Sequence, residues 1–203
     1  MKFRKHRSLS VFNLNDTQSI YLDDRGRSPG FFCRDLPVRI SRQIIEQLYQ
    51  ESEKRGGVNV RLCLHNGPDA DFHSMIILER KGGKYPPHKH LKKGESMHII
   101  QGELAVFSFD EQGSLDDCCI LQLDSVLIYR VRVAQFHSIM PLTDVVIYHE
   151  STIGPFLGEE NSILPEWAPD KDNQDQTDKF NERLLKAVQT EKKLQTSGMV
   201  DIL

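Results

Sequence analysis

Residues 82–102 have the sequence Gly82-Gly-Lys-Tyr-Pro-Pro-His88-Lys-His90-Leu-Lys-Lys-Gly-Glu95-Ser-Met-His-Ile-Ile-Gln-Gly102, which reduces to G-x5-H-x-H-x4-E-x6-G. His88 and His90 are two residues apart, so on an extended backbone both imidazoles project from the same face. Glu95 follows a four-residue bend and can return a carboxylate to the same point. The stretch therefore predicts one metal site, and Gly102 predicts a tight turn directly after the next strand.

The residues around this stretch predict an all-β domain. Residues 58–65 alternate apolar and polar side chains, which is the pattern of a strand with one buried face. Strand-like runs of the same kind follow at 74–79, 96–101, 103–109, 119–123, 126–131 and 143–150. Short connectors rich in turn residues separate them. About seven short strands with close turns are typical of an all-β sandwich or barrel.

A helix is predicted on each side of the strands. Residues 41–53 carry apolar side chains at helical spacing, Ser41 can cap the start, and the glycines that follow end the helix. The second helix is predicted over about residues 177–194. Its apolar positions at helical spacing are Phe180, Leu184, Leu185 and Val188.

Length and composition limit the class of protein. The chain has 203 residues, of which 38% are hydrophobic and 27% charged, and its net charge is −3. We expect an N-terminal extension (1–36), polar and irregular, one domain with its preceding helix (37–170) and a polar, largely helical C-terminal tail (171–203). The near-neutral charge argues against a nucleic-acid-binding protein. No apolar run approaches the roughly 18 residues of a membrane span.

Two features predict a cytoplasmic location. The first seven residues are basic, but the apolar stretch of a secretory signal does not follow them, so we expect a solvated terminus. The four cysteines form no C-x-x-C pair, and four cysteines in a chain of this length do not make a disulfide scaffold. Reduced thiols fit the cytoplasm.

The stretch 82–102 matches the first motif of the cupins at every specified position. This resemblance implies a small antiparallel β-barrel of jelly-roll type. In cupins a second motif, P-x-G-x2-H, supplies a third histidine, and its counterpart here is His137, which follows a predicted strand. The proline and glycine positions of that motif are Arg132 and Ala134 in this sequence. The resemblance implies that His88, His90, Glu95 and His137 bind one metal ion.

Further motifs resemble one group of cupins. Residues 61–65, 85–90 and 109–113, then Glu150 followed by Gly-Pro-Phe, then Trp-Ala-Pro at 167–169 occur in this order. Together they are similar to the WbuC-type cupin-fold metalloproteins, over about residues 40–170. That family is associated with bacterial O-antigen and polysaccharide gene clusters. The resemblance implies a sugar or nucleotide-sugar as the substrate class.

Three imidazoles and one carboxylate leave about two positions of an octahedral ion open, and they suit Fe, Mn, Ni, Co, Cu or Zn. Such an ion can polarise a carbonyl, stabilise an enediolate or activate dioxygen. We therefore expect a metal-dependent enzyme, and isomerisation or epimerisation and O₂-dependent oxidation are both open. The alternatives are a non-catalytic metal- or carbohydrate-binding module and a structural dimer with a vestigial site.

Three further residues are candidates for substrate binding. Arg61 and His65 share one face of the first predicted strand, and an arginine fork suits an anionic substrate. The alternative is that this face is the wet exterior. Tyr85 precedes the histidine pair and could border the site, although an aromatic residue there more often packs.

The sequence predicts minor roles for four lysines and for His98. A cluster of lysines near the ligand loop could attract a phosphate or carboxylate, or simply form a charged loop: Lys84, Lys89, Lys92 and Lys93. His98 lies an odd number of residues after Glu95, so it should face the other side of the strand.

The expected partners are a small-molecule substrate or ligand and a second copy of the chain in a homodimer, with no nucleic acid and no membrane.

Overall fold

The computed structural model describes residues 13–26, 28–34, 37–83, 85–156, 158–170 and 172–198, without the side chains of residues 159, 160 and 198. The predicted solvated terminus at residues 1–7 and the predicted role of Lys84 lie outside these residues. The strands are β1 (Ile20–Asp23), β2 (Gly30–Cys33), β3 (Val60–Cys63), β4 (Phe72–Arg80), β5 (Glu95–Gln101), β6 (Leu104–Phe109), β7 (Leu115–Leu121), β8 (Ile128–Val131), β9 (Phe136–Pro141) and β10 (Val145–Ile153). The helices are α1 (Arg42–Lys54), the short 3-10 helix η1 (Gly158–Asn161) and α2 (Gln174–Gly198).

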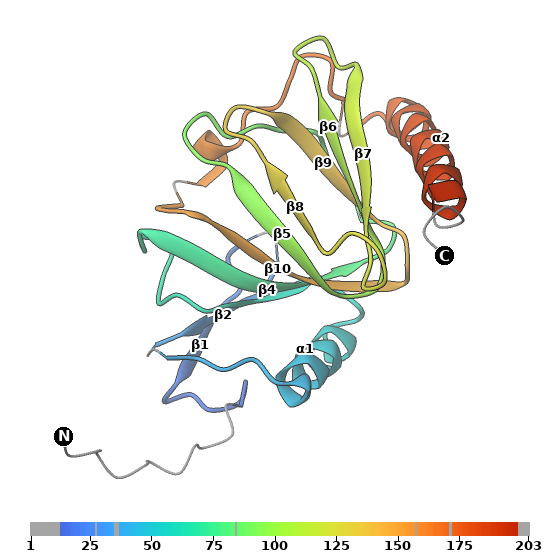
Figure 1. The fold of residues 1–203 in the computed structure, drawn as a ribbon. Coiled ribbons are helices and arrows are strands. Elements are labelled where there is room, and N and C mark those ends of the chain that lie inside the picture. The colour runs from blue at the N-terminus through green and yellow to red at the C-terminus, as the bar shows by residue number, and fades with distance from the viewer. Residues whose placement is uncertain are drawn as a thin grey trace, which may run out of the picture.

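The strands form two sheets that face each other (Figure 1). The larger sheet has the order β1-β2-β3-β4-β10-β5-β8, and the smaller has the order β7-β6-β9. Neighbouring strands are antiparallel except for the parallel pair β2 and β3. This is the all-β arrangement of jelly-roll type predicted from the sequence, with the sheets left as an open sandwich instead of a closed barrel.

Three apolar layers hold the fold together. Between α1 and the outer face of the larger sheet, Ile44 and Leu48 of the helix are completely buried. A second layer, which includes Met97 and Val106, fills the space between the sheets. A third lies beneath α2, which packs Leu184 onto the outer face of the smaller sheet (Figure 1). The two helices therefore cover the outer faces, and the inner faces of the sheets remain opposed to each other.

The all-β class and both flanking helices are confirmed, with three differences in the strands. The segment expected to be irregular contains β1 and β2, which extend the larger sheet. Both strands have only four residues, and all four residues of β2 are buried, so neither gives a clear alternating pattern. β9 was also not predicted as a strand. Its first three residues are all buried, which again hides the alternation.

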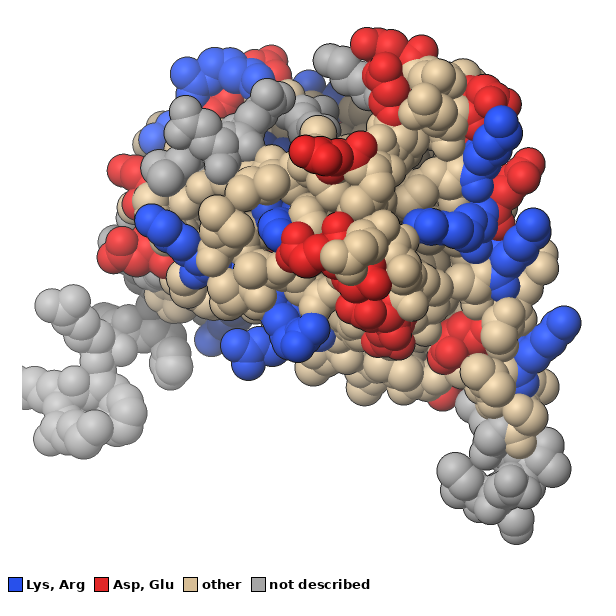
Figure 2. Space-filling model, turned by 90° about the horizontal axis from the view of Figure 1, so that it is seen from above, with Lys and Arg blue, Asp and Glu red and all other residues tan. Residues whose placement is uncertain are grey.

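The surface carries charges of both signs. On the face seen in Figure 2, acidic and basic side chains are interspersed instead of gathered into one field. None of the described helices combines the length and the apolar composition that crossing a membrane requires. All four cysteines are free.

Candidate metal centre

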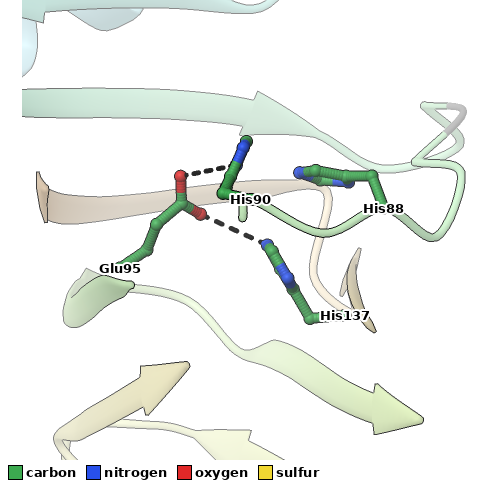
Figure 3. A group of neighbouring side chains, drawn as sticks. All are labelled: His88, His90, Glu95 and His137. Carbon is green, nitrogen blue, oxygen red and sulfur yellow. Dashed lines mark hydrogen bonds and ion pairs between the residues drawn. The ribbon is translucent and has the colours of Figure 1, made fainter. Parts of the chain in front are cut away.

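The structure brings four of the predicted site residues together. His88 and His90 lie between β4 and β5, Glu95 begins β5, and His137 lies on β9 of the other sheet. Each offers one ligand atom, and these atoms all lie within 4.8 Å of one another (Figure 3). His90, Glu95 and His137 are buried, and His88 is partly exposed. We call these four residues the His₃Glu cluster.

Backbone pairing fixes the segment that carries the two neighbouring histidines. His88 and His137 form an antiparallel bridge, in which each amide donates to the other's carbonyl oxygen at 3.0 and 2.9 Å. Lys89 forms a second bridge with Ile163. The segment is therefore extended, as the sequence predicted, and both imidazoles reach the same side of it.

The second motif places its histidine in the cluster although its sequence departs from the cupin pattern. Ala134 occupies the glycine position and has a φ of 59°, the left-handed conformation that glycine adopts most readily. Its amide donates to the carbonyl oxygen of His90 at 2.9 Å. This loop then leads into β9 and places His137 in the cluster.

Each histidine ring is oriented by a backbone carbonyl. The Nδ1 atoms of His88 and His137 lie 3.1 and 3.0 Å from the carbonyl oxygens two residues earlier, and Nδ1 of His90 lies 2.5 Å from that of Asn161. A carbonyl oxygen can only accept a hydrogen, so Nδ1 carries it and a neutral ring presents the lone pair of Nε2. Outer hydrogen bonds of this kind are what metal-binding histidines usually make.

Glu95 faces two of these Nε2 atoms. Its Oε1 lies 2.9 Å from Nε2 of His90 and its Oε2 lies 3.2 Å from Nε2 of His137, as Figure 3 shows. The Nζ of Lys93 approaches Oε1 at 3.9 Å. The carboxylate is thus placed at the same point as the rings, as the bend after His90 predicted.

Electrostatics favour metal binding by this cluster. Burial raises the pKa of Glu95, but the hydrogen bonds with His137 and His90 outweigh it, so the net pKa is well below the usual value. These hydrogen bonds need a proton on Nε2 of each ring, and a bound metal ion would take the place of those protons. Burial, together with the charge of His137, lowers the pKa of His88 to about 4. Carboxylate and neutral imidazole are the forms that bind a metal ion. The donor set and its surroundings fit a divalent transition metal.

The three predicted substrate-binding residues have their hydrogen bonds outside the cluster. Among the described residues, no hydrogen bond or ion pair joins Arg61, His65 or Tyr85 to it. The Nη1 of Arg61 donates to Ser28 Oγ at 2.8 Å. The hydroxyl of Tyr85 donates to Glu79 at 2.6 Å, and burial raises the pKa of that carboxyl to about 7.

The other described histidines have their contacts outside the cluster. His65 is buried and stacks on His73 with ring centroids 4.1 Å apart. His149 lies 2.8 Å from Ser74 Oγ through its Nε2. His98 is exposed on the opposite face of β5 from Glu95, as predicted. None of these side chains reaches the His₃Glu cluster through a hydrogen bond between described residues.

The predicted lysine cluster does not act as one patch in the part of the chain that the structure describes. Lys89 pairs with Glu111 at 2.6 Å and lies over the ring of Phe136. Lys92 is exposed, and Lys93 turns towards Glu95. Of the described lysines in this group, Lys93 alone adds positive charge next to the cluster.

A groove of about 530 Å³ opens between the edges of the two sheets. Two of its lining residues pair directly with members of the cluster, because Ser108 lies opposite His137 and Val131 lies opposite Glu95. Sequence reasoning missed this groove and also the role of Asn161. The carbonyl of Asn161 belongs to η1, 71 residues from His90, and a backbone group leaves no side-chain pattern to recognise.

Comparisons with known proteins give distant likenesses. A family model described as a domain of unknown function, DUF6016, matches residues 40–121, which is less than half of the chain. No curated protein sequence matches.

Several solved structures overlap part of the chain. A protein from Shewanella oneidensis is 16% identical, with a TM-score of 0.39 over 46% of this chain and 61% of its own. CapF, a capsular polysaccharide assembling protein from Staphylococcus aureus, is 15% identical, with a TM-score of 0.42 over 52% of this chain and 30% of its own. An oxalate oxidase is 15% identical, with a TM-score of 0.38 over 46% of each chain. Each match spans less than two thirds of the other protein, and none of these descriptions mentions the WbuC-type family, so that resemblance stays a prediction.

Proposed function

We propose that this protein binds one divalent transition-metal ion through His88, His90, Glu95 and His137 and is an enzyme for a small polar metabolite. One observation carries the proposal. Three imidazole Nε2 atoms and a carboxylate converge within 4.8 Å, while a backbone carbonyl occupies each Nδ1. A cluster held only for packing would not need all three rings turned the same way.

The roles of the chain's own residues follow from this arrangement. An ion bound here supplies Lewis-acid or redox chemistry, and imidazole with carboxylate suits Fe, Mn, Ni, Co, Cu or Zn. The three histidines would hold it through Nε2, and Glu95 would offset part of its charge. The bridge between His88 and His137 keeps donors from the two sheets at fixed positions. Isomerisation or epimerisation and O₂-dependent oxidation both remain compatible with this donor set.

The finer parts of the proposal come from the sequence. The favoured substrate class is a sugar or nucleotide-sugar of bacterial polysaccharide synthesis, by resemblance to the WbuC-type family. Arg61, His65 and Tyr85 are proposed to contact that substrate. A homodimer and a cytoplasmic location are proposed on the same basis.

A second function is a non-catalytic metal- or carbohydrate-binding module. Arg132 and Ala134 in the second motif favour it, because the sequence departs there from the cupin pattern. The position of His137 weighs against it, because the loop still delivers this histidine to the cluster.

Metal content of the tag-free protein tests the proposal. By inductively coupled plasma mass spectrometry we expect about one equivalent of a single metal, lost in His88→Ala and His137→Ala. The exposed His98 provides a matched control, and His98→Ala should retain the metal. Turnover of candidate sugars or O₂ uptake that disappears in Glu95→Ala would support an enzyme over a module. Metal-free protein after reconstitution with each candidate ion would overturn the metal site itself.

A further inference from the structure

The loop that departs from the cupin pattern lines the groove between the edges of the two sheets. Arg132 stands at the proline position of the second motif, Gln135 follows three residues later, and both line the groove. The amide of Gln135 donates to the carbonyl oxygen of Arg132 at 3.4 Å, which closes a tight turn around Ala134. The departure from the motif therefore brings a guanidinium to the groove, and the proposed metal centre makes no use of it.

Gln135 holds this guanidinium in place. Its Nε2 donates to the carbonyl oxygen of Phe109 at 2.5 Å and to Asp116 Oδ2 at 3.2 Å, and its Oε1 accepts a hydrogen bond from Nη2 of Arg132. A guanidinium has five N–H donors, and the contact with Gln135 uses one of them. Arg132 is therefore oriented by the protein and keeps donors for a ligand, a preorganisation that lowers the entropic cost of binding.

The groove also contains a second guanidinium and two carboxylates, from Arg130, Asp116 and Asp117. Among the described residues, the side chain of Arg130 forms no hydrogen bond or ion pair, and neither arginine pairs with either aspartate. Asp117 instead accepts a hydrogen bond from the hydroxyl of Tyr129 at 2.9 Å. Both arginines are exposed, so a ligand can reach them from solvent. The groove thus presents charges of both signs that do not neutralise one another.

The size and position of the groove suit a small-molecule ligand. Its volume of about 530 Å³ falls within the roughly 300–1,000 Å³ of ligand sites. Ser108 shares a face of the smaller sheet with His137, and Val131 shares a face of the larger sheet with Glu95, because residues paired in register point the same way. The groove therefore adjoins the metal centre, while none of its lining residues is a metal ligand.

We propose that this groove binds a polyhydroxylated organic anion, with Arg130 and Arg132 on its anionic group and Asp116 and Asp117 on its hydroxyls. A guanidinium fork matches the oxygens of a phosphate or a carboxylate, and a carboxylate accepts hydrogen bonds from hydroxyls. A bare inorganic anion would offer no hydroxyl carbon chain to fill the groove and would be repelled by the two aspartates. The inference goes beyond the proposed function, because this site does not require the metal ion.

Isothermal titration calorimetry on the full chain tests this site with four probes. Glucose 6-phosphate and glucuronate carry the two kinds of anionic group, whereas inorganic phosphate lacks the hydroxyls of a sugar and glucose lacks the anion. At least one sugar anion should bind more tightly than phosphate and glucose, by about tenfold or more. Arg130→Gln and Arg132→Gln should each weaken its binding about fivefold or more, the effect of one lost charge-assisted hydrogen bond. Asp117→Asn should weaken the sugar anion and strengthen inorganic phosphate, because it removes a negative charge.

Controls separate the groove from the metal centre and from general surface charge. Arg42 of α1 is also exposed and has no ion pair among the described residues, so Arg42→Gln should keep wild-type affinity. Treatment with EDTA and His88→Ala should both leave the affinity unchanged. Sugar anions that bind no better than phosphate and glucose, or that bind both arginine variants as well as the wild type, would overturn the inference. Binding lost with EDTA would assign the anion to the metal and overturn it too, whereas metal content in the same samples tests the proposed function separately.

Discussion

Two glycines of the metal-site motif offer a stringent test of the structure. Gly102 joins β5 to β6 with a φ of 81°, and a Cβ there would lie 2.5 Å from both Thr143 Oγ1 and the carbonyl oxygen of Val145. Gly82 has a φ of 86°, and a Cβ there would meet nothing within 4 Å. The two positions have the same backbone requirement and different surroundings.

The expected costs of substitution by alanine follow from these distances. A left-handed conformation costs a non-glycine residue about 1–2 kcal/mol, and the smaller entropy of the unfolded chain offsets about 0.5–1 kcal/mol, so Gly82→Ala should lower the free energy of unfolding by about 0.5–1 kcal/mol. Gly102→Ala should cost about 1–3 kcal/mol more, the usual penalty for overpacking, because a backbone oxygen cannot rotate aside. Thr143 Oγ1 also accepts the amide hydrogen of Glu103 at 3.1 Å, so its displacement would weaken the turn.

Urea unfolding of both variants and the wild type measures this difference. The loss of chain entropy in the unfolded state is similar for the two substitutions and cancels in the comparison. For a chain of this size each kcal/mol corresponds to roughly 2–4 °C in Tm, so thermal unfolding provides a second measurement. If Gly102→Ala costs no more than Gly82→Ala, the packing described around the β5–β6 turn is wrong.

Three further outcomes are expected. Ala134→Gly should raise the free energy of unfolding, measured by urea unfolding, by about 0.5–1 kcal/mol. The relief of left-handed backbone strain exceeds the cost of the larger entropy that glycine gives the unfolded chain. A loss of stability would contradict this reasoning. A metal ion at one hundred times its Kd should stabilise the fold by about 2.7 kcal/mol, a Tm rise of roughly 5–11 °C by differential scanning fluorimetry, and His137→Ala should abolish the rise. Burial, and then the charge of His73, lower the pKa of His65 from 6.5 to about 4. Its contribution to stability is therefore complete above pH 6.5 and is lost as the pH falls towards 4, about 3 kcal/mol in total. His65→Asn should flatten that part of the pH–stability curve measured by urea unfolding, and an unchanged slope would argue against the buried neutral ring.

The candidate site was predicted in part because its main segment obeys a local rule. Spacing by two on an extended chain places His88 and His90 on one side, and the structure has that arrangement. His137 needed the resemblance to a known motif, since its strand β9 has no alternating pattern of burial.

Local sequence patterns also explain which other elements were predicted and which were missed. Helix α1 was predicted closely because Ile44 and Leu48 lie at helical spacing within one continuous segment. Strands β1 and β2 depend on pairing with β3, which lies across a helix in the sequence. Contacts between distant segments decide those strands, and no local pattern encodes them.

The short helix η1 has a consequence for how this site can be transferred or recognised. The orientation of His90 depends on the carbonyl of Asn161, and Lys89 is bridged to Ile163 just beyond it. A protein engineered to carry all four donors, but with a different chain after β10, would lack the group that aims one of them. The unit to graft is therefore the histidine segment together with residues 158–163, and a search for donor spacing alone would accept sequences in which that ring is free to turn.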